Sequence, residues 1–494
     1  MAEVELTGVA GDLDAAVADL AGRFRAALEP PARAAAELDS PTLRARFDEP
    51  LPDDGMPVEA ILAQLDERSS GGLAGSTGGR YFGYVTGAAL PAAAIVEAWT
   101  AAVDQNVGMW PLGPAAVELE QVTLGWLADL LGYPGAGSAG GQATGTRPET
   151  GPPKAAPGAS GYFGSGATMA NTVSLAVARH WFGRKHGVDV REEGVRALPP
   201  LAVYGSEELH LSDHKALRTL GLGSGCVRAI PIDSEYAMEV DPLVAAIERD
   251  RKAGVEPAIV IAQAGSVNTG ASDPLDAIAD ICERYGLWLH VDGAFGAFFG
   301  LCERTAPLVR GMERADSLTV DGHKWLNVPN GVGFALLRDA ELHHETFGGS
   351  AGYLTPGSGA NLHEFGFEAS RSWRGACVWA ALKALGRSGV EELVTRCCDL
   401  AAELGAIVED HPRLELAAPA PTNIVCFRYV RDGIDGEEAN RAIQAEVAAA
   451  GSVFHTGATL EGRFCQRAAI CSWRTTADDV RALADEVVRV GDGL

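Results

Sequence analysis

The sequence predicts an α/β fold in which helices cover both faces of a mostly parallel sheet, followed by a smaller C-terminal α+β domain. From about residue 81, short apolar segments of strand length alternate with longer segments of helical period, which is typical of parallel sheets. After about residue 385, fewer strands and helices alternate, as in a small separate unit. Since 494 residues exceed one simple domain, we expect three segments, 1–80, 81–384 and 385–494.

Residues 1–80 are expected to form helices at the periphery. Ala15–Leu28 and Val58–Leu65 have helical periodicity, and the prolines at Pro30-Pro31 and Pro50–Pro52 interrupt the pattern. This segment has too few large apolar residues to form a domain alone. We therefore expect it to be an arm that packs across a second subunit.

Apolar and helical patterns place the elements of the two remaining segments. In 81–384 the predicted strands are Leu201–Tyr204, Ala258–Ala262, Leu287–Val291, Ser317–Val320 and Val332–Leu337, and the predicted helices are Thr168–Phe182, Pro242–Arg251 and Pro274–Tyr285. In 385–494 the strands are Asn423–Val430 and Arg467–Trp473, and the helices are Gly436–Ala450 and Ala477–Val490.

One segment, Gly135–Ser160, is rich in Gly, Ala, Pro and Thr. Its first residues, Gly135–Gly140, match the dinucleotide-loop pattern G-x-G-x-x-G. Such a loop must follow a strand and open a helix, whereas this match leads into further Gly and Pro residues. We interpret residues 135–160 as a flexible surface insertion.

The formal net charge of -26 argues against nucleic acid and anionic membranes as partners, because both require a basic surface. The nine cysteines include no C-x-x-C pair, so we expect buried, reduced thiols rather than disulfides. The acidic N-terminal sequence lacks the features of a secretion signal, and no apolar stretch has the length of a membrane span. A cytoplasmic protein is expected.

The first candidate for chemistry is Lys324, in His323-Lys324-Trp325 directly after the strand Ser317–Val320. Burial at such a position lowers the pKa of an ammonium group and leaves a nucleophilic amine, which a Schiff-base enzyme requires. An ordinary surface lysine beside a core tryptophan is the alternative.

The second candidate is Asp292, at the end of the apolar strand Leu287–Val291. A buried carboxylate is costly unless it meets a cation. The protonated pyridine nitrogen of pyridoxal phosphate (PLP) is such a cation. The alternative is a carboxylate that caps the following turn.

Two further segments complete the pattern. The small-residue loop Gly164–Asn171 opens a helix whose free N–H groups suit a phosphate. His210 follows the strand Leu201–Tyr204 and would stack on a flat ring, or be a structural histidine. Since ligands of open α/β sheets bind where strands end, we expect these segments, Asp292 and Lys324 to converge on one crevice.

With these motifs, the sequence resembles the pyridoxal-dependent (group II) decarboxylase family, which includes aromatic-amino-acid, tyrosine and glutamate decarboxylases. The resemblance extends from about Tyr81 to the C-terminus. Besides the segments above, it includes Tyr81–Tyr84, Leu119-Glu120, Trp126-Leu127, Val291–Ala294, Ser370-Arg371 and Val378–Leu382. It implies PLP fold type I, with a seven-stranded type of sheet, and a homodimer with active sites near the interface.

The resemblance also implies roles for individual residues. Lys324 would form the Schiff base with PLP, Asp292 would pair with the pyridinium, and His210 would stack on the ring. The remaining assignments are Ser165, Gly166, Ala167 and His323 around the phosphate, Ala294 in the cofactor-binding segment, and Tyr353 as the group that protonates the substrate carbon after CO2 leaves. An inert surface loop is the alternative for the Tyr353 segment.

Some segments depart from the family pattern. Asn330 and Val332 replace a Tyr-Asp type of segment, and Ser372 replaces the second arginine of a Ser-Arg-Arg pattern. Both departures bear on substrate choice. Met109–Pro114 aligns with a region near the substrate side chain and is apolar and aromatic, which favours an aromatic or aliphatic amino acid as the small-molecule partner.

The expected function is PLP-dependent decarboxylation of an L-amino acid to its amine. Two alternatives on the same fold are an aldehyde-forming oxidative deaminase and an aminotransferase. A catalytically silent scaffold is a third, against which intact Lys324, Asp292 and His210 argue. No metal site is expected, because His343 and His344 are adjacent and do not share a helix face.

Overall fold

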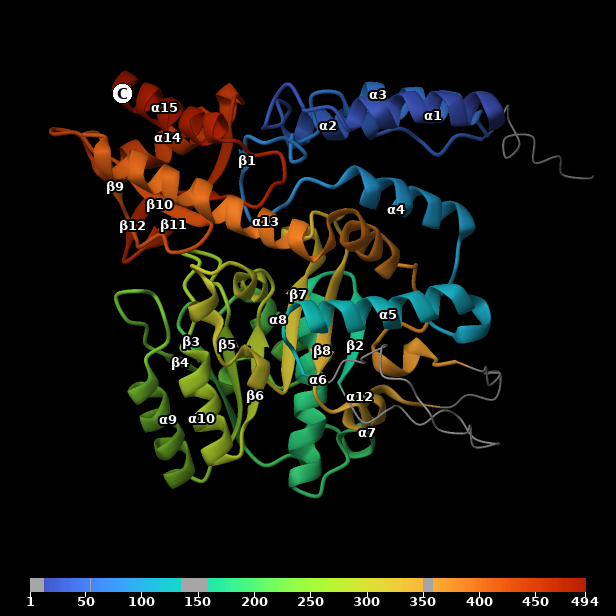
Figure 1. Ribbon diagram of the computed structural model, residues 1–494, viewed down its shortest axis with the longest axis vertical. Helices are drawn as coiled ribbons and strands as arrows, with labels where there is room; N and C mark the ends of the chain where they lie inside the picture. The colour runs from blue at the N-terminus through green and yellow to red at the C-terminus, as the bar shows by residue number, and fades with distance from the viewer. Residues whose placement is uncertain (1–12, 54, 135–158, 350–358) are drawn as a thin grey trace, which may run out of the picture.

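Two β-sheets organise the chain in the computed structural model, which describes residues 13–53, 55–134, 159–349 and 359–494 (Figure 1). The predicted insertion, except Ala159 and Ser160, and the candidate Tyr353 lie outside the described residues. None of the helices in the described ranges combines the length and apolar character needed to span a membrane.

The larger sheet has seven strands in the order β2-β8-β7-β6-β5-β3-β4. Only β8 runs against its neighbours, and the other strands run in one direction. The mostly parallel, seven-stranded sheet is therefore confirmed. Its strands are β2 (Ser160–Gly164), β3 (Leu201–Ser206), β4 (Val227–Ile230), β5 (Glu256–Gln263), β6 (Trp288–Asp292), β7 (Ser317–Asp321) and β8 (Gly333–Leu337).

Helices cover both faces of this sheet. On β3 and β5, Val203 and Ile259 belong to the apolar cluster that includes helix α6 (Ala167–Lys185). Their neighbours Tyr204 and Val260 belong to a second cluster, with α9 (Val240–Lys252) and α10 (Leu275–Tyr285). Successive strand residues point to opposite faces, so both faces are buried. This explains why the strands read as continuous apolar runs.

The remaining helices pack around these layers. On the α6 side lie α8 (Leu211–Thr219) and α12 (Ala340–Phe347). The others are α4 (Pro91–Val103), α5 (Pro114–Leu130), α7 (Val190–Glu193), α11 (Gly322–Trp325) and the 3-10 helices η1 (Trp110–Leu112), η2 (Val195–Ala197), η3 (Ser224–Cys226), η4 (Gly296–Leu301), η5 (Ala306–Val309), η6 (Met312–Arg314) and η7 (Leu362–Phe365).

The smaller sheet has five strands in the order β1-β11-β12-β10-β9. Helices α13 (Gly375–Asp410), α14 (Gly436–Ala450) and α15 (Ala477–Gly493) pack with it, which confirms the small α+β unit. Its strands are β1 (Tyr81–Phe82), β9 (Leu414–Leu416), β10 (Ile424–Tyr429), β11 (Phe454–Leu460) and β12 (Arg463–Ala469).

The two units share α13. This helix has a non-helical residue, Gly386 (φ 65°), one residue beyond the start of the predicted third segment. In addition, β1 pairs with β11 in parallel, so residues 81–82 lie in the small sheet although the sequence groups them with the large segment. The division into three segments stays a prediction.

Residues 13–80 contain α1 (Leu13–Ala27), α2 (Ser40–Phe47) and α3 (Val58–Ser69), which lie beside the C-terminal unit (Figure 1). Within the described part of this stretch, the only buried apolar side chains are Ala16, Ala34 and Ala35. The Ala34 N–H donates to the Gly451 carbonyl oxygen at 2.8 Å. Helices at the periphery are thus present as expected.

Candidate active site

Lys324, Asp292 and His210 lie at one edge of the large sheet. Asp292 is the last residue of β6, Lys324 follows β7 in the single turn α11, and His210 follows β3 as the N-cap of α8. These three strands run in parallel, so their carboxyl ends meet at the same edge. The convergence expected from the sequence is present for these three side chains.

Asp292 is a buried, ionised carboxylate. Its Oδ2 accepts a hydrogen bond from Asn171 Nδ2 at 2.9 Å, and its Oδ1 accepts one from the Ala294 N–H at 2.9 Å. Burial by itself raises the pKa of Asp292, but the Lys324 ammonium and these two donors outweigh burial and hold the pKa below its ordinary value. The carboxylate therefore caps the following turn and is also available to a cation.

Asn171 fixes the orientation of this carboxylate. It is fully buried on α6 and also donates to Ser212 Oγ at 3.1 Å. Its Oδ1 lies 3.1 Å from His290 Nε2, and His290 Nδ1 lies 2.8 Å from Ser317 Oγ. Burial lowers the pKa of His290 to about 4. The neutral ring therefore donates from Nε2 to Asn171 and accepts the Ser317 O–H at Nδ1.

His210 presents a neutral, half-buried ring. Its Nδ1 accepts the Ser212 N–H at 3.2 Å and lies 2.7 Å from Ser212 Oγ, so the ring proton belongs on Nε2. Burial lowers the pKa of His210, and Lys324 and Lys215 lower it further, against the opposing effect of Asp292. The ring is thus engaged as a helix cap and is also part of the cluster around Asp292.

Lys324 is half-buried, next to the fully buried Trp325. Among the hydrogen bonds and ion pairs within the described ranges, none involves the Lys324 ammonium. The ammonium nevertheless acts electrostatically on both Asp292 and His210. A primary amine without a competing partner, close to a carboxylate and a flat ring, has the composition that an aldehyde cofactor requires.

The predicted phosphate loop opens α6. Gly166 is the N-cap with φ 144° and no side-chain cap, and a Cβ added there would meet nothing within 4 Å. The Ala167 N–H donates to Asp321 Oδ2 at 3.3 Å, and Asp321 Oδ1 lies 2.7 Å from His323 Nδ1. A Cβ added at Gly333 would collide with the backbone of this loop. Open space before a helix N-terminus, beside an imidazole, suits a phosphate group.

The sequence interpretation missed three residues of the site: Asn171, His290 and Asp213. His290 precedes Asp292 by two residues, so strand periodicity places both side chains on one face. Asn171 is one helical turn beyond Ala167 and is the last residue of the predicted phosphate loop, Gly164–Asn171, but the sequence alone suggested no role for its side chain. Asp213 is fully buried, and burial followed by the negative charge of Asp292 raises its pKa well above the ordinary value.

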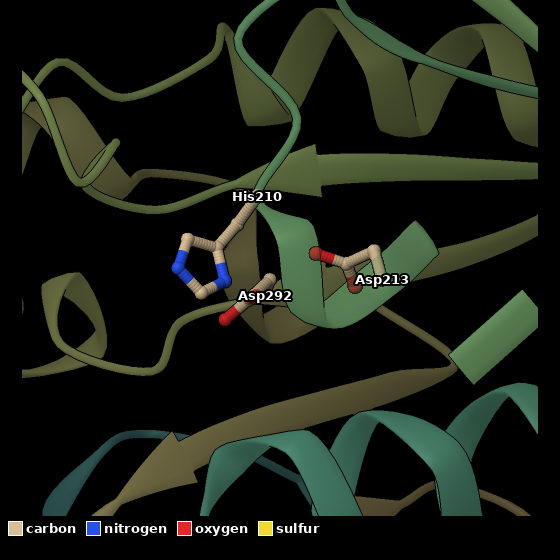
Figure 2. A group of neighbouring side chains, drawn as sticks. All are labelled: His210, Asp213 and Asp292. Atoms are coloured by element: carbon tan, nitrogen blue, oxygen red, sulfur yellow. The ribbon is translucent and has the colours of Figure 1, made fainter. Parts of the chain in front are cut away.

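His210, Asp213 and Asp292 each place one nitrogen or oxygen within 4.8 Å of the others (Figure 2). Such a group resembles a set of metal ligands. However, both Asp292 oxygens already accept N–H donors, and a ligating carboxyl must be deprotonated, which the raised pKa of Asp213 disfavours. We therefore interpret the group as a carboxyl pair beside an imidazole.

Comparisons with known proteins agree with this geometry. A family model described as the pyridoxal-dependent decarboxylase conserved domain matches residues 41–430. An aromatic-L-amino-acid decarboxylase of Bacillus atrophaeus is 28% identical over 466 residues, covering 91% of this chain and 90% of the relative. A phenylacetaldehyde synthase of Petunia hybrida is 25% identical over 441 residues, covering 84% of this chain and 81% of the relative.

Solved structures have the same fold. The crystal structure of Oryza sativa TDC with PLP and tryptamine superposes with a TM-score of 0.86 and 23% sequence identity, covering 100% of this chain and 99% of the other. The crystal structure of mouse CSAD gives a TM-score of 0.85 and 23% identity, covering 97% and 99%.

Proposed function

The chain belongs to the pyridoxal-dependent decarboxylase family, and from this membership we propose that it converts an aromatic or aliphatic L-amino acid to its amine. Its cofactor is PLP, its fold is PLP fold type I, and it is a carboxy-lyase. The observation that best supports the proposal is the ionised, buried Asp292 within electrostatic reach of Lys324.

The residues present fit the cofactor. PLP, when bound, accepts the electron pair that remains on the substrate carbon after CO2 leaves. In the proposed roles, Asp292 holds a proton on the pyridine nitrogen and Lys324 Nζ is the amine that receives the aldehyde. His210 offers its neutral ring to the flat cofactor. Ser165, Gly166 and Ala167, with His323, hold the phosphate.

The proposed substrate class rests on two observations. The segment Met109–Pro114 has apolar and aromatic side chains, and Trp110 and Leu112 are partly exposed. The Bacillus atrophaeus relative is an aromatic-L-amino-acid decarboxylase. A side chain without charge would meet compatible surroundings there, whereas a second carboxylate would require a cation.

A product screen tests the proposal. Purified, PLP-loaded protein is incubated with a panel of L-amino acids, and products are identified by mass spectrometry. We expect an amine lighter than its parent by one CO2 from one substrate class, and none from Lys324→Ala. Lys215→Ala, which changes a second lysine near His210, is the matched control and should form the amine.

The proposal fails if wild-type protein has PLP attached at Lys324 but forms no amine from any amino acid. Borohydride reduction followed by peptide mapping establishes the attachment independently of activity, because it makes the lysine–cofactor bond permanent.

Aldehyde formation is the second candidate, since the Petunia hybrida relative is a phenylacetaldehyde synthase. The oxidative reaction consumes O2 and water and releases CO2, ammonia and hydrogen peroxide with the aldehyde. Measuring oxygen uptake in the same screen separates the two reactions. Tyr353, assigned by resemblance only, stays a prediction: Tyr353→Phe should retain PLP and shift products from amine to aldehyde.

A further inference from the structure

Asp213 is a second buried carboxyl beside Asp292 (Figure 2). We propose that Asp213 is held as the neutral acid and donates a hydrogen bond to the Asp292 carboxylate, so that Asp292 stays ionised toward the cofactor ring nitrogen. The existence of this carboxyl pair does not depend on the cofactor, whereas its effect on the ring rests on the function proposed above. Asp213 is thus a positioning residue that acts through Asp292.

The surroundings of Asp213 differ from those of an ordinary acid in a first helical turn. Such acids usually face solvent or free backbone N–H groups. Asp213, the third residue of α8, is 0% exposed. Among the groups that the structure describes, no well-formed hydrogen bond reaches either of its carboxylate oxygens, and the nearby Asp213 N–H and Ser212 hydroxyl do not offset its burial. A fully buried carboxylate without a donor is too costly to persist.

A proton between the two carboxyls removes this cost. The oxygens of Asp213 and Asp292 are near each other, but two ionised carboxylates only accept hydrogen bonds and repel. When one of them is protonated, it becomes the donor that the other lacks. Hydrogen bonds from an acid to a carboxylate are also stronger than those between neutral groups.

The proton belongs on Asp213. Asp292 receives donors from Asn171 and Ala294 and lies near the Lys324 ammonium, all of which favour its ionised form. For Asp213, burial and the charge of Asp292 outweigh the pKa-lowering effects of its own N–H and of the Ser212 hydroxyl, and so favour its neutral form. The titratable groups around the Asp213–Asp292 pair are His210 and Lys215 beside or on α8, His290 on β6 and Lys324 on α11, while α6 contributes the uncharged Asn171.

The donor also affects the cofactor. A hydrogen bond to Asp292 lowers the affinity of that carboxylate for protons. The proton shared with the ring nitrogen therefore stays on the nitrogen rather than on Asp292 Oδ1 or Oδ2. Without Asp213, Asp292 competes better for this proton, and the ring becomes a weaker electron acceptor.

The first test uses cofactor-free protein. Infrared spectroscopy should show the carbonyl band of a buried, protonated carboxylic acid at neutral pH, and Asp213→Asn should lack it. Asp241→Asn, which changes an exposed acid in the first turn of α9, is the control and should keep the band. Retention of the band in Asp213→Asn overturns the proposal. If Asp213→Asn does not fold, Asp213→Thr replaces it, and this variant should also lack the band.

Thermal stability gives a second readout. A carboxyl whose pKa is raised by folding contributes stability below its ordinary pKa of 3.8, and that contribution is lost as the pH rises toward the folded value. Asp213→Asn does not titrate, so its melting temperature relative to wild type should increase from pH 5 to pH 8. If the melting temperatures of wild type and Asp213→Asn change equally between pH 5 and pH 8, Asp213 is not protonated in the folded protein.

The cofactor effect is tested with PLP labelled with 15N in the ring. The nitrogen chemical shift should indicate a protonated ring in wild type and in Asp213→Asn, whose amide still donates. In Asp213→Leu it should move toward the unprotonated value, with kcat reduced about tenfold and KM little changed. An unchanged shift in Asp213→Leu overturns the positioning role. Failure of wild type to bind PLP at Lys324 would instead reject the proposed function, with the infrared band still present.

Discussion

His343 illustrates how much a single buried side chain contributes to the packing of this protein. It lies on α12, its Nδ1 is 2.7 Å from Ser160 Oγ, and its Nε2 is 2.8 Å from the Phe365 carbonyl oxygen. Because a carbonyl only accepts, Nε2 donates to Phe365 and Nδ1 accepts the Ser160 O–H. Burial lowers the pKa of His343 to about 3. The neutral ring thus connects α12 to β2 and η7.

We predict that His343 makes the protein sensitive to acid. The unfolded chain takes up a proton near pH 6.5, whereas folded His343 does so only near pH 3. Its contribution to stability is present above pH 6.5 and is lost as the pH falls. Between pH 7 and pH 5 the loss is about 2 kcal/mol. The difference in unfolding free energy between wild type and His343→Gln should narrow by this amount, as measured by denaturant unfolding.

The neighbouring His344 provides the control, since its side chain is 49% exposed. The difference in unfolding free energy between wild type and His344→Gln should be the same at pH 7 and at pH 5. If the difference in unfolding free energy between wild type and His343→Gln stays constant from pH 7 to pH 5, folding does not change the pKa of His343 and the prediction is wrong.

At the residue scale, the sequence is enough to predict a site residue when its place along a strand alone determines where its side chain lies. Asp292 and Lys324 follow buried strands, so their location at the sheet edge is predictable. Asp213 could not be predicted in this way. An acid in a first helical turn is usually solvent-exposed, and only the packing of α8 on α6, which brings its first turn beside Asp292, buries this one. Asn171 likewise acquires its role from a carboxylate 121 residues away.

At the scale of elements, a buried ion pair joins α5 to the start of α13. Arg371 donates from both terminal nitrogens to Glu120, at 3.0 and 2.7 Å, and the side chains are 1% and 0% exposed. The Gly375 N–H donates to the same carboxylate at 2.9 Å. Glu120 and Arg371 lie in two segments that resemble the decarboxylase family, so at least this part of the resemblance reflects packing.

We predict that Glu120→Gln destabilises the protein by about 3–5 kcal/mol, because the Arg371 guanidinium would remain buried without its anion. Denaturant unfolding measures the change. The matched control is Asp129→Asn, which breaks the exposed pair between Asp129 of α5 and Arg387 of α13. This change should cost less than about 1 kcal/mol. Equal effects of the two substitutions would contradict the buried-pair argument.

Elements were predictable where an apolar run is long and uninterrupted, as in β5 and β6. β2 (Ser160–Gly164) was missed and partly assigned to the insertion, since two glycines in five residues weaken the strand pattern. The strand predicted at Arg467–Trp473 is β12, Arg463–Ala469. That prediction was shifted because Ile470 and Cys471 are buried beyond the strand end. The Ile470 N–H also donates to the Asn423 carbonyl oxygen at 2.9 Å, so the strand-like surroundings extend one residue past the end of β12.

At the scale of the whole molecule, we propose a homodimer. Three elements that pack on one apolar cluster, α4, η1 and α5, carry apolar side chains that are more than a third exposed: Ile95, Trp99, Leu112, Val122 and Trp126. Exposed apolar groups of this kind mark interfaces. The helices α4 and α5 both pack on α13, the helix that the two units share.

Sedimentation analysis should give twice the 51.5 kDa mass of the chain. The double substitution Trp99→Glu, Trp126→Glu should yield monomers with the same circular-dichroism spectrum, since both side chains are partly exposed. A wild-type protein that sediments as a monomer at every concentration would contradict the proposal.

The pairing of β1 with β11 has a consequence for biosynthesis. Tyr81 pairs with Phe454 and Phe82 with His455, and Ala34 bonds to Gly451. A ribosome therefore makes Ala34, Tyr81 and Phe82 long before it makes their partners at residues 451–455. Domains generally fold in the order of synthesis, but here Ala34, Tyr81 and Phe82 cannot reach their native partners until residues 451–455 emerge. Until then, the edge of β11 and the backbone groups of β1 that pair in the folded protein stay unpaired.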